Sequence, residues 1–145
     1  MSSAGRAFAG LKVMVIDDSL ALRRDAERFL VEAGCTVILA QDGLEALAKI
    51  NDHEPDVVFL GIRMPRLDGY RTCAIIKKNA RFTRTPVIML SFSGSLFDRA
   101  RSRIAGSDAC ISKPLNQETL LHAISCCTAA QASAGQPSAA PARAD

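Results

Sequence analysis

The chain has 145 residues, a length that favours one domain with room for a short tail. Its 18 Lys and Arg residues against 15 Asp and Glu residues give a net charge of +3, too small to indicate nucleic acid or an anionic membrane as the partner. No apolar run reaches the roughly 18 residues that cross a bilayer, and no signal peptide is visible, so we expect a cytoplasmic protein without a membrane span.

The five cysteines include no pair with the CxxC spacing of redox and metal motifs. We therefore expect them to serve as small buried hydrophobic residues. The adjacent Cys126 and Cys127 leave redox chemistry open as an alternative, although neighbouring residues of a helix point in different directions.

Short runs rich in Val and Ile alternate with helical patterns along the chain. The runs lack a strict apolar and polar alternation, which is typical of strands covered on both faces. The expected strands are residues 12–16, 36–40, 56–60, 86–90 and 109–112.

Helix signals fill the intervals between these runs. Ser19 is the expected N-cap of the first helix, which Gly34 closes. Asp42 with Glu45 forms a variant capping box at the start of the second helix, and Asp68 precedes the third. The fourth helix carries Leu96, Phe97, Ala100 and Ile104, and the fifth follows Pro114.

Strict alternation of strands and helices predicts an α/β fold with parallel strands, right-handed crossovers and helices on both faces of the sheet. We expect a flavodoxin-like (βα)5 doubly wound sheet with strand order 2-1-3-4-5. The expected domain spans residues 11–128, after an N-terminal extension at 1–10 and before a disordered Ala/Ser/Pro-rich tail at 129–145. In such sheets the functional crevice lies beyond the carboxyl ends of the first and third strands.

Charged residues follow two of the expected strands. Asp17 and Asp18 come after the first strand, and Lys113 comes after the fifth. Two adjacent carboxylates usually need a cation such as Mg²⁺, and a lysine across the crevice is a fixed point charge for a phosphoryl group. The alternative is a set of solvated loop charges.

The chain resembles the receiver domain of bacterial two-component response regulators, the CheY-like family. The motifs are V-I-D-D-S at 15–19, M-P-R-L-D-G at 64–69, P-V-I-M-L-S at 86–91 and S-K-P at 112–114. The resemblance covers residues 11–128. Within the family, the stretches at 65–77 and 96–101 look most like the single-domain receivers of the type IV pilus twitching-motility system.

The resemblance implies a role for each residue at the strand ends. Asp17 and Asp18 correspond to the acid pair that holds Mg²⁺. Ser91 corresponds to the switch hydroxyl that bonds the phosphoryl group, and Lys113 to the lysine that pairs with it. The phosphoacceptor aspartate does not carry over, because Gly61 stands three residues before Met64-Pro65.

Glycine has no oxygen to phosphorylate, and it also removes one carboxylate ligand of the metal. We therefore expect no cofactor, with Mg²⁺ held weakly at Asp17 and Asp18 or lost. Asp56 lies at the wrong end of its strand to substitute, and Asp68 is expected to cap a helix. Arg63 is a candidate to swing toward the acid pair and replace the metal ion.

Further positions depart from the family pattern. Phe92 stands where receivers keep a small residue, and its side chain is a candidate to fill the space left at Gly61. Cys110 replaces the aromatic switch residue, and Leu115 replaces the Phe that commonly follows Lys-Pro. Changes to acceptor, pocket and switch together favour a naturally degenerate receiver over an engineered loss of the acceptor alone.

The surface charge is uneven. Between Arg63 and Arg84 seven basic residues and one acidic residue give a local net charge of +6, which is typical of a solvated face and can also steer an acidic protein partner. No recognition helix or output domain indicates DNA. In receivers the partner surface corresponds here to segments within Leu96–Ser125.

We therefore expect a non-enzymatic pseudo-receiver, which signals through protein contacts without Asp phosphorylation in a two-component or pilus-motility pathway. The alternative is a conventional Mg²⁺-dependent phosphoacceptor receiver whose acceptor aspartate has been mutated to Gly61. A third, weaker hypothesis is an enzyme or ligand-binding protein with an open pocket lined by Asp17, Asp18 and Lys113.

Overall fold

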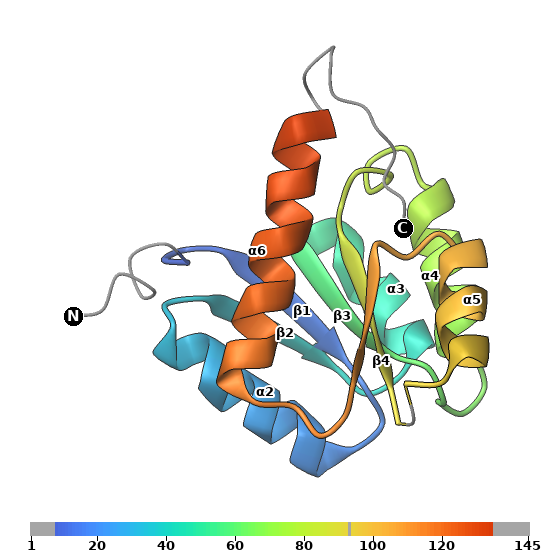
Figure 1. Ribbon diagram of the computed structural model, residues 1–145, viewed down its shortest axis with the longest axis horizontal. Helices are drawn as coiled ribbons and strands as arrows, with labels where there is room; N and C mark the ends of the chain where they lie inside the picture. Colours follow the sequence, from blue (N-terminus) through green and yellow to red (C-terminus); the bar gives the residue numbers. More distant parts are fainter. Residues whose placement is uncertain (1–7, 93, 135–145) are drawn as a thin grey trace.

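A computed structural model describes residues 8–92 and 94–134. Within this described part, five parallel strands form one sheet in the order β2-β1-β3-β4-β5, and a helix follows each strand (Figure 1). The elements are β1 (Lys12–Ile16), α2 (Leu20–Glu32), β2 (Thr36–Ala40), α3 (Gly43–His53), β3 (Val57–Gly61), α4 (Gly69–Lys78), β4 (Val87–Ser91), α5 (Leu96–Ile104), β5 (Ala109–Ser112) and α6 (Gln117–Ala134). The predicted doubly wound (βα)5 fold and its strand order are confirmed.

The predicted caps begin the helices because their side-chain oxygens accept the backbone N–H groups that a first turn leaves unpaired. Ser19 Oγ accepts from Leu22 N at 3.2 Å, and Asp42 Oδ1 accepts from Glu45 N at 2.8 Å. Asp68 Oδ1 accepts from Arg71 N at 2.9 Å. These capping predictions are confirmed.

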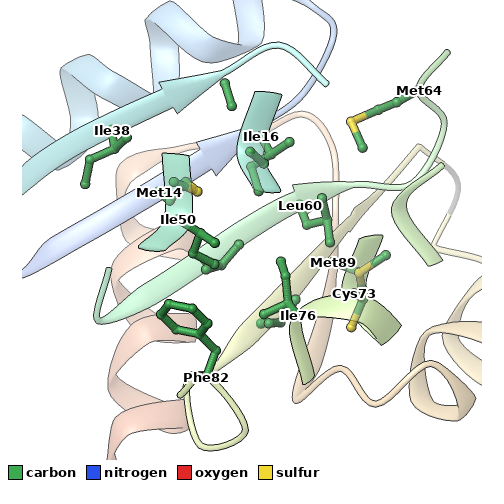
Figure 2. Packing of buried hydrophobic residues seen from close by; sticks show 14 of the residues in the cluster. Met14, Ile16, Ile38, Ile50, Leu60, Met64, Cys73, Ile76, Phe82 and Met89 are labelled. Atoms are coloured by element: carbon green, nitrogen blue, oxygen red, sulfur yellow. The ribbon is translucent and has the colours of Figure 1, made fainter. Parts of the chain in front are cut away.

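Helices cover both faces of the sheet and bury two hydrophobic clusters. Alternate residues of β1 point to opposite faces: Met14 and Ile16 enter a cluster with residues of α3 and α4, whereas Val13 and Val15 enter one with residues of α2 and α6. Figure 2 shows the first cluster, in which Ile50 of α3 and Ile76 of α4 pack on the strands. Burial on both faces explains why the strand sequences are continuously apolar.

Strands β3 and β4 each begin and end one residue later than predicted, and both boundaries of the predicted domain need correction. α6 continues to Ala134, so residues 129–134, which we predicted to be disordered, are helical, because the segment is mostly alanine, the strongest helix former. Residues 135–145 and 1–7 lie outside the described residues. The end of the predicted N-terminal extension is attached to the domain, since Phe8 packs against the second cluster and Gly10 N donates to Gly34 O at 2.9 Å. No helix in the described ranges has both the length and the apolarity to cross a membrane.

The strand register decides which residues meet at the carboxyl edge of the sheet. Ile16 of β1 is paired with Leu60 of β3, so the next residues, Asp17 and Gly61, lie side by side. Ser91 of β4 is paired with Ser112 of β5, which places Lys113 one residue beyond Ser91 on the neighbouring strand. The fold therefore brings four predicted site residues to one edge.

Candidate functional site

Asp17 is the most enclosed charged residue at this edge, with 1% of its surface exposed. Its Oδ2 lies 3.0 Å from Lys113 Nζ, and its Oδ1 accepts from Ser19 N at 2.9 Å. Its backbone carbonyl accepts from Arg23 Nη1 at 2.6 Å. Both carboxylate oxygens are therefore engaged by groups of the protein itself, as a buried charge requires.

Gly61 leaves the room that the Asp17 carboxylate occupies. A Cβ added at Gly61 would lie 3.0 Å from Asp17 Cγ, 3.5 Å from Ile16 O, and still closer to Asp17 Oδ2. Any larger residue at this position would therefore displace the Asp17 carboxylate or other neighbouring atoms. The Asp17 carboxylate can therefore lie in its present position only because residue 61 has no side chain.

Phe92 does not fill this space, contrary to our prediction. Its side chain is 69% exposed, and its ring centroid lies 4.2 Å from Lys113 Nζ in a cation–π contact. The physical reason is that the Asp17 carboxylate already occupies the volume beside Gly61, and the outer side of the Lys113 ammonium offers the ring an electrostatic contact.

Lys113 is held between these two partners. Its side chain is 12% exposed, and its Nζ contacts both the Asp17 carboxylate and the Phe92 ring. A mostly buried ammonium needs a compensating charge, and Asp17 supplies it. In the resembled receivers this lysine pairs with the phosphorylated aspartate, whereas here it is already paired with a carboxylate from β1.

The donor set does not fit the Mg²⁺ ion of the resembled family. Asp17 Oδ2 faces an ammonium, Asp18 is exposed, and Gly61 contributes no side-chain oxygen. The described residues contain no group of three or more His, Cys, Asp or Glu side chains placed to hold a metal. A metal ion would have to displace Lys113 from Asp17 before it could bind both predicted ligands.

The prediction that Arg63 replaces the cation is wrong. Arg63 is exposed, and no ion pair within 4.0 Å joins it to Asp17 or Asp18 in the described part of the chain. Lys113 takes this place because it follows β5 at the same carboxyl edge of the sheet, and its side chain reaches Asp17 across the ends of β4 and β3. The Arg63 side chain is instead turned to solvent.

Ser91 is tied to α5 by a hydrogen-bond network that includes residues the sequence did not single out as functional. Ser91 Oγ donates to Asp98 Oδ2 at 2.7 Å and accepts from Gly94 N at 2.9 Å. Tyr70 OH donates to Asp98 Oδ1 at 3.2 Å, and burial together with the Asp98 charge raises the pKa of Tyr70. A hydroxyl has one proton to donate, so Ser91 can bond another acceptor only by releasing Asp98. No sequence signal distinguished Asp98 from an ordinary first-turn acid.

Cys110 and Leu115 pack without polar roles of their own. Cys110 is partly buried against the first hydrophobic cluster, beside the Ser102 hydroxyl, and burial raises its thiol pKa. Tyr70 packs against the same cluster, so an aromatic side chain reaches this region from α4 rather than from β5. Leu115 packs against the second cluster.

Much of the predicted basic band is neutralised within the fold. Lys77 Nζ lies 3.0 Å from Asp108 Oδ2, and Arg81 pairs with Glu54. Arg66, whose φ of 70° is left-handed, lies 3.6 Å from Asp42. The band is therefore less available to an acidic partner than its sequence charge indicates.

The cysteines are free thiols, and their environments predict selective reactivity. Burial raises the pKa of Cys73 to about 12 and that of Cys127 to about 11, whereas Cys126 is exposed. Only a thiolate attacks an alkylating reagent, so at pH 8 we expect Cys126 to react well before Cys73 or Cys127. A time course with iodoacetamide and peptide mass spectrometry measures this order. Native-state labelling of Cys127 as fast as Cys126 would contradict it.

The fold and the strand-end residues are those of a signalling module. The response regulator receiver domain family matches residues 13–125, and the chain belongs to this family. Its members are signalling modules rather than enzymes.

Individual relatives sharpen this classification. The chain is 59% identical over 115 residues to protein PilG of Pseudomonas aeruginosa, covering 79% of this chain and 85% of PilG. It is 37% identical to the response regulator MprA of Mycobacterium sp. (strain KMS), covering 77% of this chain but only 47% of MprA. The solved structure of chemotaxis protein CheY4 of Vibrio cholerae superposes with a TM-score of 0.77 at 32% identity, over 81% of this chain and 98% of CheY4.

Proposed function

We propose that this chain is a degenerate receiver, or pseudo-receiver, that acts as a phosphorylation-independent protein-interaction module. Its setting would be a cytoplasmic two-component pathway that controls type IV pilus twitching motility. The pilus assignment is supported by the resemblance of residues 65–77 and 96–101 to single-domain receivers of the type IV pilus system, and the 59% identity to PilG agrees with a receiver of this kind.

The observation that supports phosphorylation independence is that residue 61 has no side chain and that the Asp17 carboxylate lies beside it. Glycine has no oxygen that could form an acyl phosphate, and the Asp17 carboxylate lies in the space where a side chain would begin. Asp17 also gives Lys113 the negative partner that a phosphorylated aspartate would otherwise provide. A glycine within a strand costs only about 0.5–1 kcal/mol relative to alanine, so the fold tolerates the change.

Magnesium is not part of the proposed working state. A magnesium ion at Asp17 and Asp18 would have to break the ion pair between Asp17 and Lys113. The described residues place no third carboxylate there to compensate for that loss. The third hypothesis, an enzyme or binding pocket in this crevice, receives no support, because Asp17 and Lys113 bind each other and the family is one of signalling modules.

The test of this proposal is exposure to acetyl phosphate with excess Mg²⁺, followed by intact-mass spectrometry under conditions that preserve acyl phosphates. We expect no mass increase, while a receiver with an aspartate at the end of β3 is labelled in the same reaction. An acyl phosphate on any residue of the crevice would overturn the proposal.

The partner contact is proposed on the face built from α5, β5 and α6, within Leu96–Ser125. If this face is presented permanently, partner binding will be the same with and without acetyl phosphate. This expectation follows from the fixed contacts of Ser91 and Lys113, which link the strand ends to α5 and to the loop before it.

A further inference from the structure

α6 carries an imidazole and a thiol side by side on its outer surface. His122 Nε2 lies 3.4 Å from Cys126 Sγ, and both residues are exposed. Residues four apart in a helix lie on the same side of it, one turn above the other. α6 covers one face of the sheet and lies in the foreground of Figure 1, so both groups can be reached from solvent.

The packing of α6 determines that these two residues face outward. Leu120, Ile124 and Cys127 are buried in the second hydrophobic cluster, against the sheet. With about 100° between successive residues of a helix, His122 and Cys126 fall on the opposite side, about 40° apart. They therefore stay exposed and adjacent for as long as the helix packs on the sheet.

The distance between the two side-chain atoms fits a tetrahedral zinc ion. Zn²⁺ binds a cysteine sulfur at about 2.3 Å and a histidine nitrogen at about 2.0–2.1 Å, and a tetrahedral angle between these bonds sets sulfur and nitrogen about 3.5 Å apart. The observed separation is 3.4 Å. A linear arrangement with the same bond lengths would need about 4.3 Å. A zinc ion can therefore take the place of the hydrogen between the two side chains with little movement of either.

We propose that His122 and Cys126 form a binding site for Zn²⁺, with one ion per chain. The ion bonds to Nε2 of the neutral imidazole and to Sγ of the thiolate, and the thiol proton passes to water. The metal stays divalent, so the step needs no oxidant or reductant. The described residues place no third His, Cys, Asp or Glu beside the pair, and water therefore fills the remaining positions.

This site is separate from the strand-end crevice and does not depend on the proposed function. Thiolate and imidazole suit zinc, whereas Mg²⁺ prefers oxygen ligands. In the crevice Asp17 is already paired with Lys113, but within the described part of the chain no ion pair within 4.0 Å engages His122. Cys126 also lies just beyond residues 13–125, which match the receiver family, so membership of the family assigns the pair no role.

The test titrates the reduced full chain, without a polyhistidine tag, with Co²⁺ as a coloured substitute for Zn²⁺. We expect saturation at one ion per chain, a thiolate-to-cobalt charge-transfer band in the near ultraviolet, and loss of that band when Zn²⁺ is added. The absence of the band, or its persistence after Zn²⁺ is added, would overturn the proposal. One ion per two chains, with a dimer in sedimentation, would also overturn it, because the site would then require a second copy.

Variants locate the ligands. Cys126→Ser is expected to abolish the charge-transfer band, and His122→Ala to weaken Co²⁺ binding at least tenfold. The matched controls are His53→Ala, which removes the other histidine of the chain, and Cys127→Ala, which removes the neighbouring buried thiol. Both controls should bind Co²⁺ within twofold of the wild type, and far-ultraviolet circular dichroism shows that each variant is folded. Equal weakening in His53→Ala and His122→Ala would reveal non-specific binding and overturn the proposal.

Alkylation gives a second readout that does not depend on cobalt. A thiolate bonded to a metal ion is withdrawn from reaction, so Zn²⁺ should slow the labelling of Cys126 by iodoacetamide at least tenfold. An equal concentration of Mg²⁺ should leave the rate unchanged, and a chelator should reverse the effect of Zn²⁺. Equal labelling rates with and without Zn²⁺ would overturn the proposal.

Discussion

Replacing Asp17 with asparagine is expected to lower the free energy of unfolding by about 3 kcal/mol. The substitution keeps the shape of the side chain but leaves the Lys113 ammonium, 12% exposed, without a counter-charge. We expect the lower end of the cost for a broken buried pair because Lys113 keeps its contact with the Phe92 ring. Urea unfolding followed by far-ultraviolet circular dichroism measures the change.

The neighbouring acid provides the control for this experiment. Asp18 is exposed, so Asp18→Asn should stay within about 0.5 kcal/mol of the wild type. Equal effects of Asp17→Asn and Asp18→Asn would show that the ion pair with Lys113 contributes nothing specific.

Gly61→Asp is expected to destabilise the protein by about 2 kcal/mol in the absence of divalent ions, within the range found for overpacked sites. Its Cβ would lie 3.0 Å from Asp17 Cγ, and the new carboxylate would repel that of Asp17. Mg²⁺ should reverse part of this loss, because three neighbouring carboxyl groups offer the oxygen ligands that the wild type lacks. Thermal unfolding of variant and wild type across a Mg²⁺ titration measures both effects.

Combining the two substitutions tests whether Asp17 holds the place of the missing acceptor. In the double variant Asp17→Asn with Gly61→Asp, the carboxylate introduced at position 61 can pair with Lys113. We therefore expect the double variant to lose less unfolding free energy than the two single variants lose together. Simple additivity would show that the two positions do not compete for Lys113.

The Gly61→Asp variant also distinguishes a naturally degenerate receiver from a conventional receiver whose acceptor aspartate has been mutated. If Gly61→Asp alone accepts a phosphoryl group as readily as a conventional receiver, the remaining site is intact, and a recent loss of the acceptor aspartate is favoured. If it stays unlabelled even at high Mg²⁺, the ion pair and the hydrogen bond that occupies Ser91 have adapted to the absence of the acceptor.

The strand ends and α5 form one connected structure. Asp17 holds Lys113, and Lys113 contacts Phe92 at the start of the loop that leads to α5. Ser91 reaches Asp98 on α5 itself. Contacts within the chain therefore set the position of α5, one helix of the face that we propose for the partner contact, without a covalent phosphate.

The sequence by itself determined the features that depend on neighbouring residues. Apolar runs, caps at Ser19, Asp42 and Asp68, and the regular alternation of patterns specify the elements and restrict the topology, because each signal acts within a few residues. The four motifs identified the family, and Gly61 could be recognised as lacking a phosphoacceptor oxygen from its spacing to Met64-Pro65.

Only the tertiary structure decided which partner each charged or aromatic side chain takes. Arg63, Lys113 and a metal ion were competing cations for Asp17, and that competition is settled by strand register and by the volume left at Gly61. Phe92 and the apolar residues of α5 are exposed because a carboxylate and a hydrogen-bonded Asp98 occupy the interior positions. Helical spacing defines a stripe but not the direction it faces, since that direction depends on residues distant in the sequence.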